Sequence, residues 1–174
     1  MNRFRLMPSS GIAIIFLIST AVVAGADEQA RFDITGWIDR EETTWIIQSD
    51  HRTPSAVFST IRPGLHQFRI HAYSNERYRR EGSVYLELVI RDGEVSSTQI
   101  QFFPFAPLHP RFSFGQDHGT GQLTLHSLEI EAGNAHLVAS FAGELYYHQS
   151  PNTQPIPHRT RPMRIDIDLV AVRD

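Results

Sequence analysis

The densest group of side chains suited to binding is a set of aromatic and cationic residues around one short segment. The set consists of Tyr73, Arg77, Tyr78, Arg79 and Arg80. Guanidinium groups recognise carboxylates and phosphates, and tyrosine rings stack on other rings and on sugars. Because loops often carry binding residues, this segment is the candidate ligand- or partner-binding loop. The alternative is a solvated turn whose charge is offset by Glu76 and Glu81.

Histidine is frequent in this chain, which contains nine of them, so metal binding is a second possibility. The candidate metal ligands are His109, Asp117 and His118, which lie in or beside one predicted loop. No pair of them has a spacing known from zinc or copper sites, and histidines scattered over strand surfaces would give the same count. The sequence therefore predicts no cofactor and leaves metal handling as an alternative.

Motifs for catalysis are missing from the sequence. There is no Gly-x-Ser-x-Gly elbow, and without lysine or cysteine the chain has no Schiff base, thiol nucleophile or disulfide. His126 is predicted opposite Phe141 on an apolar face, where a histidine pKa is readily perturbed. Carboxylates from which a pair for glycoside cleavage could come are Glu87, Asp117, Glu129 and Glu144. A small hydrolase is therefore the alternative to a non-enzymatic protein.

The segments that must position these residues alternate in a two-residue pattern, which is typical of strands with one buried face. The pattern is strongest in Leu65–Tyr73, Ser83–Arg91 and Pro162–Val172. Shorter strands are expected at Arg31–Ile38 and Thr43–Ile47. No segment of helical length has an apolar stripe at 3.6-residue spacing, and the ambiguous segment Thr53–Arg62 is interpreted as a strand.

Turn residues predict a first hairpin between Ser83–Ile90 and Glu94–Phe103. A two-residue turn would place Leu86 opposite a glutamine, whereas a three-residue loop places Val84 opposite Ile100. Facing residues share one side of a sheet, so the three-residue loop is the prediction.

A second hairpin is predicted between Gln122–Glu131 and Ala135–Tyr147, with its turn at Gly133-Asn134. The apolar phase changes at Ser127, which indicates a bulge or a strand that passes between two sheets. Two proline-containing segments are predicted to be loops: Phe103–His118 and His148–Pro162.

The N-terminal residues follow the order of a cleaved secretory signal. Arg3 and Arg5 precede an apolar run from Ile12 to Val23, which ends at Ala24-Gly25-Ala26. A membrane span needs about 20 apolar residues, and this run is shorter. The prediction is a signal peptide over residues 1–26, with no stable membrane anchor after cleavage.

Residues 27–174 are mildly acidic. Removing Arg3 and Arg5 leaves 14 of the 16 basic residues against 19 acidic ones, a net charge of −5 with histidine neutral. This balance argues against nucleic acid as a partner, because nucleic acid selects a strongly basic face.

The length of residues 27–174 suits one domain. We expect a single all-β domain over residues 27–174, an antiparallel β-sandwich or partly open barrel of about eight strands.

These patterns predict an exported protein of the bacterial envelope, periplasmic or extracellular, that binds a small ligand or another envelope protein and is not an enzyme. The prediction rests on exclusion, because neither a catalytic motif nor a cofactor fingerprint accompanies the β-rich pattern. The hydrolase and the metal-handling protein are its two alternatives.

Export of the full chain by its own N-terminal segment is expected to yield a protein that begins at Asp27. Intact mass spectrometry of the exported protein measures this directly. A mass that still includes Met1 would contradict cleavage and indicate a chain that stays anchored.

Overall fold

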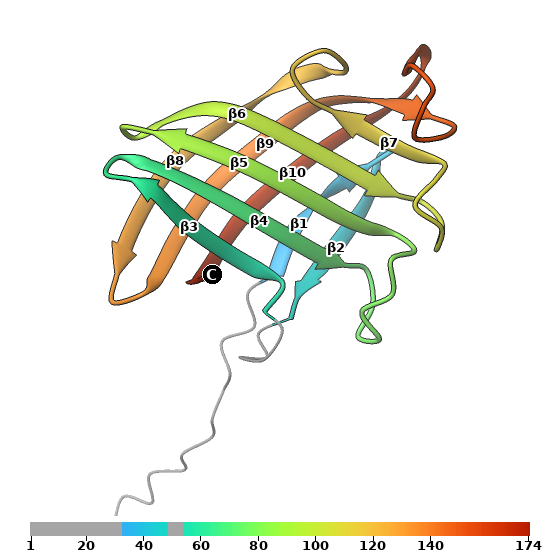
Figure 1. Ribbon diagram of the computed structural model, residues 1–174. Helices are drawn as coiled ribbons and strands as arrows, with labels where there is room; N and C mark the ends of the chain where they lie inside the picture. Colours follow the sequence, from blue (N-terminus) through green and yellow to red (C-terminus); the bar gives the residue numbers. More distant parts are fainter. Residues whose placement is uncertain (1–32, 49–53) are drawn as a thin grey trace, which may run out of the picture.

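The computed structural model describes residues 33–48 and 54–174, which form ten strands in one large mixed sheet (Figure 1). The predicted all-β class is confirmed, with ten strands instead of about eight. The predicted signal peptide lies outside the described residues. The strands are β1 (Asp33–Ile38), β2 (Glu41–Ile47), β3 (Ala56–Arg62), β4 (Leu65–Tyr73), β5 (Ser83–Arg91), β6 (Glu94–Phe103), β7 (Arg111–Phe114), β8 (Thr120–Glu131), β9 (Asn134–His148) and β10 (Ile156–Arg173).

Among the residues that the structure describes, there is no helix with the length and apolar character needed to cross a membrane.

The two longest strands, β9 and β10, form a central ribbon. They pair antiparallel along most of their length, with Ile165 facing Phe141. Buried and exposed residues alternate along both strands, so the ribbon has an apolar inner face and a polar outer face. The alternation predicted for Pro162–Val172 is confirmed, since Ile165 and Ile167 are buried between exposed Arg164, Asp166 and Asp168.

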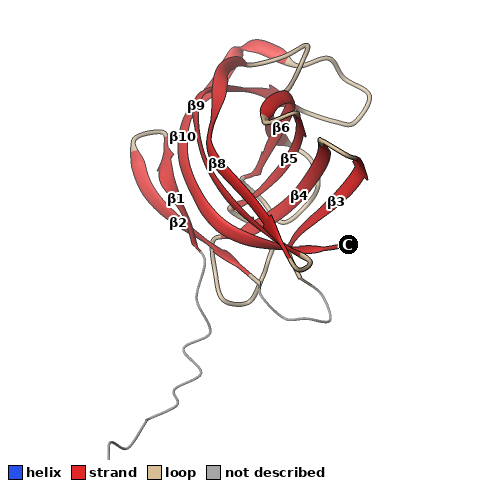
Figure 2. Cartoon of the chain, turned by 90° about the vertical axis from the view of Figure 1, so that its left-hand side faces the viewer, coloured by secondary structure: helices blue, strands red, loops and turns tan. Residues whose placement is uncertain are grey.

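The sheet closes partly into a ring (Figure 2). It does so because the outer edge of each ribbon strand pairs with two other strands, at different positions along its length. β10 pairs with β1 and, in a short parallel contact at Val172 and Arg173, with β3. β9 pairs with β8 and, at its end, with β7. The strands from β3 to β7 then run round the ring. Of the two predicted architectures, the partly open barrel is closer, and the parallel contact makes the sheet mixed rather than antiparallel.

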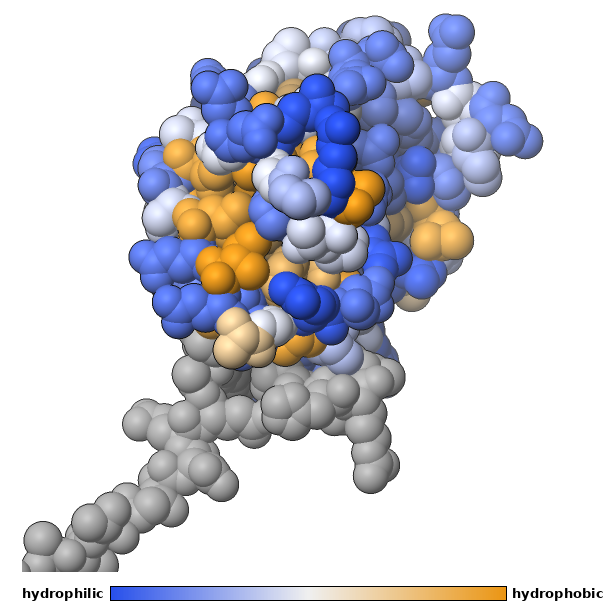
Figure 3. Space-filling view, turned by 60° about the vertical axis from the view of Figure 1, so that its left-hand side comes forward, coloured by the Kyte–Doolittle hydropathy of each residue, from blue (hydrophilic) through white to orange (hydrophobic). Residues whose placement is uncertain are grey.

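One seam of this ring has no backbone pairing among the described residues. β6 pairs with β7 only from Ile100 to Phe102, and β8 pairs only with β9. Apolar side chains near the seam, including Val95, Leu128 and Ile130, are therefore only partly buried. In Figure 3 the side of the molecule that lies on the left in Figure 1 comes forward. It shows apolar surface that is framed by hydrophilic residues.

Large apolar side chains fill the inside of the ring. Trp45 is fully buried, and its Nε1 donates a hydrogen bond to the carbonyl of Gly82 at 2.8 Å, so its polar atom is satisfied. Arg161 covers the core near β7: its guanidinium lies 4.8 Å from the Phe112 ring centroid and pairs with Asp39 at 3.2 Å. Each fully buried large side chain stabilises the fold by roughly 1.5–3 kcal/mol.

The β5–β6 hairpin has a register that the sequence did not predict. Its tip is the two-residue turn Asp92-Gly93, whose φ angles of 52° and 84° are both positive, as a type I′ turn requires. A bulge after Val89 then shifts the pairing by one residue, so that Leu86 faces Ile100. The predicted pairing of Val84 with Ile100 is therefore wrong, because a bulge brings the apolar residues together instead of a longer loop.

The connections that follow also differ from the prediction. The β8–β9 turn is Ala132-Gly133, not Gly133-Asn134, and again both φ angles are positive. The predicted loop from Phe103 to His118 contains β7, and the predicted loop from His148 to Pro162 ends where β10 begins at Ile156. The strand interpretation of Thr53–Arg62 is confirmed from Ala56 onward as β3.

The bulge predicted near Ser127 is present, and it changes the position of His126. It lies between Leu125 and Ser127, and Leu123 occupies the place opposite Phe141. His126 is exposed, with its Nε2 2.9 Å from the hydroxyl of Ser140. The prediction that His126 faces Phe141 is wrong, because the extra residue of the bulge reverses the faces of the strand beyond it.

Replacing Gly36 with alanine is expected to reduce the free energy of unfolding by about 2 kcal/mol. Gly36 faces Ile165 across the β1–β10 pair, and a Cβ there would overlap the carbonyl oxygen of Arg164 and approach Ile165 Cα at 2.8 Å. Because these are backbone atoms, the strands must separate. Urea denaturation measures the loss, and Thr35→Ala, exposed on the same strand, is the matched control. Equal small effects for both variants would contradict this close contact.

Candidate functional site

A hollow of about 680 Å³ lies on the outer faces of β4 and β5. Alternate residues of β4 enter the core, so Arg69, His71 and Tyr73 remain on the outer face. Tyr85 of β5 is the register partner of His71 and joins them. The remaining lining comes from the β2–β3 connection, β3 and the end of β10: Gln48, Pro54, Ser55, Val57, Arg173 and Asp174.

Aromatic rings follow one side of this hollow and continue into the loop after β4. His71 and Tyr73 stack with ring centroids 4.3 Å apart, and the edge of Tyr78 meets Tyr73 at 5.3 Å. Tyr85 and Phe103 approach His71 at 6.2 and 6.4 Å. We call these five residues the aromatic cluster. Aromatic rings in such contacts keep a fixed surface on which another ring can stack.

Both ring nitrogens of His71 lie near hydroxyl groups. The Tyr73 hydroxyl lies 3.2 Å from Nδ1, and the Ser83 hydroxyl lies 3.1 Å from Nε2. Burial lowers the pKa of His71, and the positive charge of Arg80 lowers it further. His71 is therefore neutral near pH 7 and acts here as a packing and hydrogen-bonding group.

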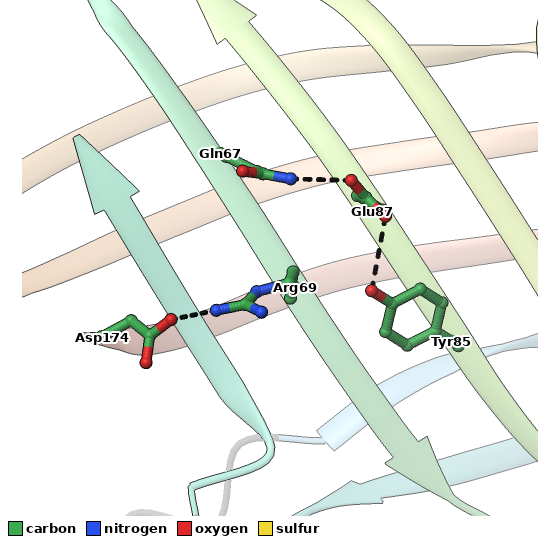
Figure 4. A network of polar contacts seen from close by, with 5 residues as sticks. All are labelled: Gln67, Arg69, Tyr85, Glu87 and Asp174. Carbon is green, nitrogen blue, oxygen red and sulfur yellow. Dashed lines mark hydrogen bonds and ion pairs between the residues drawn. The ribbon is translucent and has the colours of Figure 1, made fainter. Parts of the chain in front are cut away.

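Polar contacts order the charged residues beside the aromatic cluster (Figure 4). Gln67 donates a hydrogen bond to Glu87 at 2.7 Å, and the Tyr85 hydroxyl donates to the other Glu87 oxygen at 3.4 Å. Burial raises the pKa of Tyr85, and the negative charge of Glu87 raises it further, so the phenol stays protonated. Arg69 pairs with Asp174 from the end of β10.

Arg173 is also among the residues that line the hollow. Arg173 lies over the Phe58 ring, with its Cζ 5.6 Å from the ring centroid, and makes no ion pair with a described side chain. A guanidinium stacked in this way keeps its N–H edges available to an acceptor. The rings of His71, Tyr73 and Tyr85, together with Arg69 and Arg173 in the lining, give the hollow the chemistry to hold a ring that carries an anionic group.

The structure brings together three of the five residues predicted from the sequence. Tyr73 and Tyr78 belong to the aromatic cluster, and the Arg80 guanidinium lies 5.8 Å from the Phe103 ring centroid. Arg77 and Arg79 are exposed on the loop, where their backbone N–H groups both donate to the Asn75 side chain. Of the five predicted residues, Tyr73 alone is among those that line the hollow.

Sequence reasoning missed most of the residues that line the hollow. The exposed positions of Leu65–Tyr73 were a usable signal, because Arg69, His71 and Tyr73 had to share one face. The pairing of His71 with Tyr85 and the arrival of Arg173 beside β4 were not predictable, since both depend on contacts between distant segments.

The residues predicted as metal ligands lie near β7. The backbone of His118 pairs with Gly115, and its ring meets the ring of His148 edge-on at 5.0 Å. Within residues 33–48 and 54–174, no group of three or more His, Asp or Glu side chains is arranged to hold a metal ion, so His109, Asp117 and His118 form no such group.

A buried serine–histidine contact lies beside them. The Ser113 hydroxyl and His148 Nε2 are 2.6 Å apart, and the two residues are only 2% and 8% exposed. Burial, together with His118 and Arg111 nearby, lowers the pKa of His148 to about 4. A neutral, shielded imidazole of this kind stabilises the β7–β9 pair and is a poor general base at neutral pH.

The carboxylates considered for glycoside cleavage are spread over both walls of the ring and, in the case of Asp117, the exposed turn after β7. Glu87 is on the outer face of β5, where Gln67 and Tyr85 use its oxygens. Glu129 and Glu144 are exposed on β8 and β9, which form the opposite wall of the ring.

Comparisons with protein-family models, with curated proteins and with solved structures find no match to this chain.

Acidification is expected to destabilise the protein between about pH 6.5 and pH 4. In this range the unfolded chain protonates at position 148 while folded His148 stays neutral, so the free energy of unfolding falls with pH, by up to about 3 kcal/mol. The lowered pKa values of His71, His109 and His118 act in the same direction.

Urea denaturation at a series of pH values measures this slope, and His148→Gln is expected to flatten it. An NMR titration of the His148 ring tests the same point without a variant. A midpoint near 6.5 would contradict the burial argument.

Proposed function

We propose that this chain is an exported, non-enzymatic binding module of the bacterial envelope whose ligand docks on the outer face of β4 and β5. The order of charge, apolar run and small residues over residues 1–26 supports export. Loops and sheet faces that present aromatic and arginine side chains commonly carry recognition, which supports binding.

The observation that carries the proposal is the position of Tyr73. Its ring lies between His71 and Tyr78, and it borders a hollow that Arg69 and Arg173 also line. The core does not require these side chains on the outside of the sheet, because the buried residues of β4 and β5 already fill the ring.

The chemistry of the lining favours a small, ring-containing ligand with a carboxylate or phosphate group. The ring would stack on the aromatic cluster, and the anionic group would accept hydrogen bonds from the two guanidinium groups. A catalytic role has less support, because His71 is neutral with both nitrogens beside hydroxyls and Glu87 already accepts two hydrogen bonds.

A panel of aromatic and sugar carboxylates and phosphates, followed by ¹H–¹⁵N NMR, is expected to give saturable shifts centred on the hollow. Tyr73→Ala and Arg173→Gln should each weaken binding at least tenfold, since each removes one half of the recognition. Arg91→Gln, at the exposed tip of β5, is the matched control and should bind normally.

Loss of the stacking surface is distinguished from loss of folding by the free energy of unfolding of each variant. If no member of the panel shifts the residues of the hollow, or if Tyr73→Ala binds as tightly as the unmodified chain, the proposed site is wrong.

A further inference from the structure

A second surface with binding chemistry lies on the opposite wall of the ring, on the outer faces of β1, β10, β9 and β8. The strand registers arrange its side chains in rows that cross all four strands. One row consists of Trp37, Arg164, Ala142 and Gln122. The next row consists of Thr35, Asp166, Ser140 and Thr124. All of these residues are exposed or half-buried, and we call them the four-strand face.

Trp37 is the unusual member of this face. Its ring is 46% exposed, although its neighbours Gly36 and Ile38 are buried in the core. Among the described residues it makes no hydrogen bond and no ring contact, in contrast to Trp45, which is fully buried and donates to Gly82. The fold therefore gives no structural use for the Trp37 side chain, and an exposed tryptophan is a strong anchor for a partner.

The four-strand face is hollowed on both sides of Arg164. One hollow, of about 750 Å³, is lined by Trp37, Arg40, Glu144 and Arg164 among others. A second, of about 550 Å³, is lined by short or polar side chains together with Arg164: Gln122, Thr124, Ser140 and Ala142. Both hollows include Arg164, so they adjoin at this residue, and we call the two hollows together the groove.

The charge of this groove favours an acidic ligand. Arg40 and Arg164 are exposed, and neither makes an ion pair with a described side chain. Glu144 is the one carboxylate among the residues that line the two hollows, so their lining has a net charge of +1, while Asp166 of the next row and Glu42, the register partner of Trp37, lie beside it. Guanidinium forks of this kind match the geometry of a carboxylate.

We propose that the groove of the four-strand face binds an acidic oligosaccharide. One sugar ring stacks its C–H face on Trp37, and a sugar carboxylate accepts hydrogen bonds from Arg40 and Arg164. Farther along the groove, the ligand hydroxyls bond to the side chains of Gln122, Thr124 and Ser140. This site is on the other wall of the ring from the aromatic cluster and does not depend on the function proposed for that cluster.

The shape of the groove favours a sugar chain over a protein partner. Its floor is made of short side chains such as Ala142 and Ser140, and its walls offer hydroxyl and amide groups at intervals along its length. An extended ligand with many hydroxyl groups matches this pattern of donors and acceptors. A protein hot spot would instead require a deep apolar pocket at its centre.

The two tryptophans of the chain make the test direct. Trp45 is buried, so quenching by acrylamide reports mainly on Trp37. Adding a hexasaccharide of galacturonic acid to the full chain is expected to protect Trp37 from acrylamide and shift its emission to shorter wavelength. Because the carboxylate contacts are ionic, the apparent Kd should rise with sodium chloride. The neutral hexasaccharide cellohexaose should bind at least tenfold more weakly.

Isothermal titration calorimetry with variants locates the site. Trp37→Ala and Arg164→Gln should each raise the Kd for the galacturonic acid hexasaccharide at least tenfold, and Ala142→Phe should block the groove. Phe105→Ala, which removes another exposed aromatic ring, is the matched control and should leave the Kd unchanged. Thermal melting of each variant shows whether it is folded.

Three outcomes would overturn the proposal. The hexasaccharide of galacturonic acid could fail to protect Trp37, which is also the result expected if this face docks a protein. Folded Trp37→Ala could bind it with an unchanged Kd. Cellohexaose could bind as tightly as the galacturonic acid hexasaccharide, which would show that the arginines do not recognise a sugar carboxylate. None of these results bears on the hollow beside the aromatic cluster.

Discussion

Pairing between β9 and β10 holds the molecule together, because four strands pair with their outer edges and the remaining strands join the sheet through those four. β10 carries β1 and β3 on its outer edge, and β9 carries β8 and β7. The ribbon has a strict inner and outer face, so these attachments place their own apolar residues inside the ring. A one-residue slip of this pair would expose the core and misplace both outer walls.

The same two-faced arrangement explains why the candidate sites are on the outside. The inside is filled by aromatic and branched side chains, so the proposed sites lie on the outer walls. On one wall the aromatic cluster and two arginines border a hollow, and on the other Trp37 and Arg164 border a groove. His71 and His148 have lowered pKa values because burial penalises their charged forms.

Strand positions were largely predictable, whereas registers and closure were not. Alternation located β4, β5 and β10 because a half-buried strand must repeat every two residues. It could not show the bulge after Val89, and it could not anticipate that β3 meets β10 in parallel. It also left β7 inside a predicted loop, since four residues are too few for a periodic pattern.

From its residue types alone, the sequence determined an all-β chain without thiol chemistry, and it indicated that Tyr73, Tyr78 and Arg80 were candidates for binding. Tertiary structure decided which residues accompany them. It brought Tyr85 and Arg173 beside Tyr73, left the other four predicted residues outside the hollow, and placed Trp37 next to Arg164. The reason is physical: alternation along one strand specifies a side chain's face, but its neighbours across the sheet depend on turns, bulges and edge pairings between distant segments.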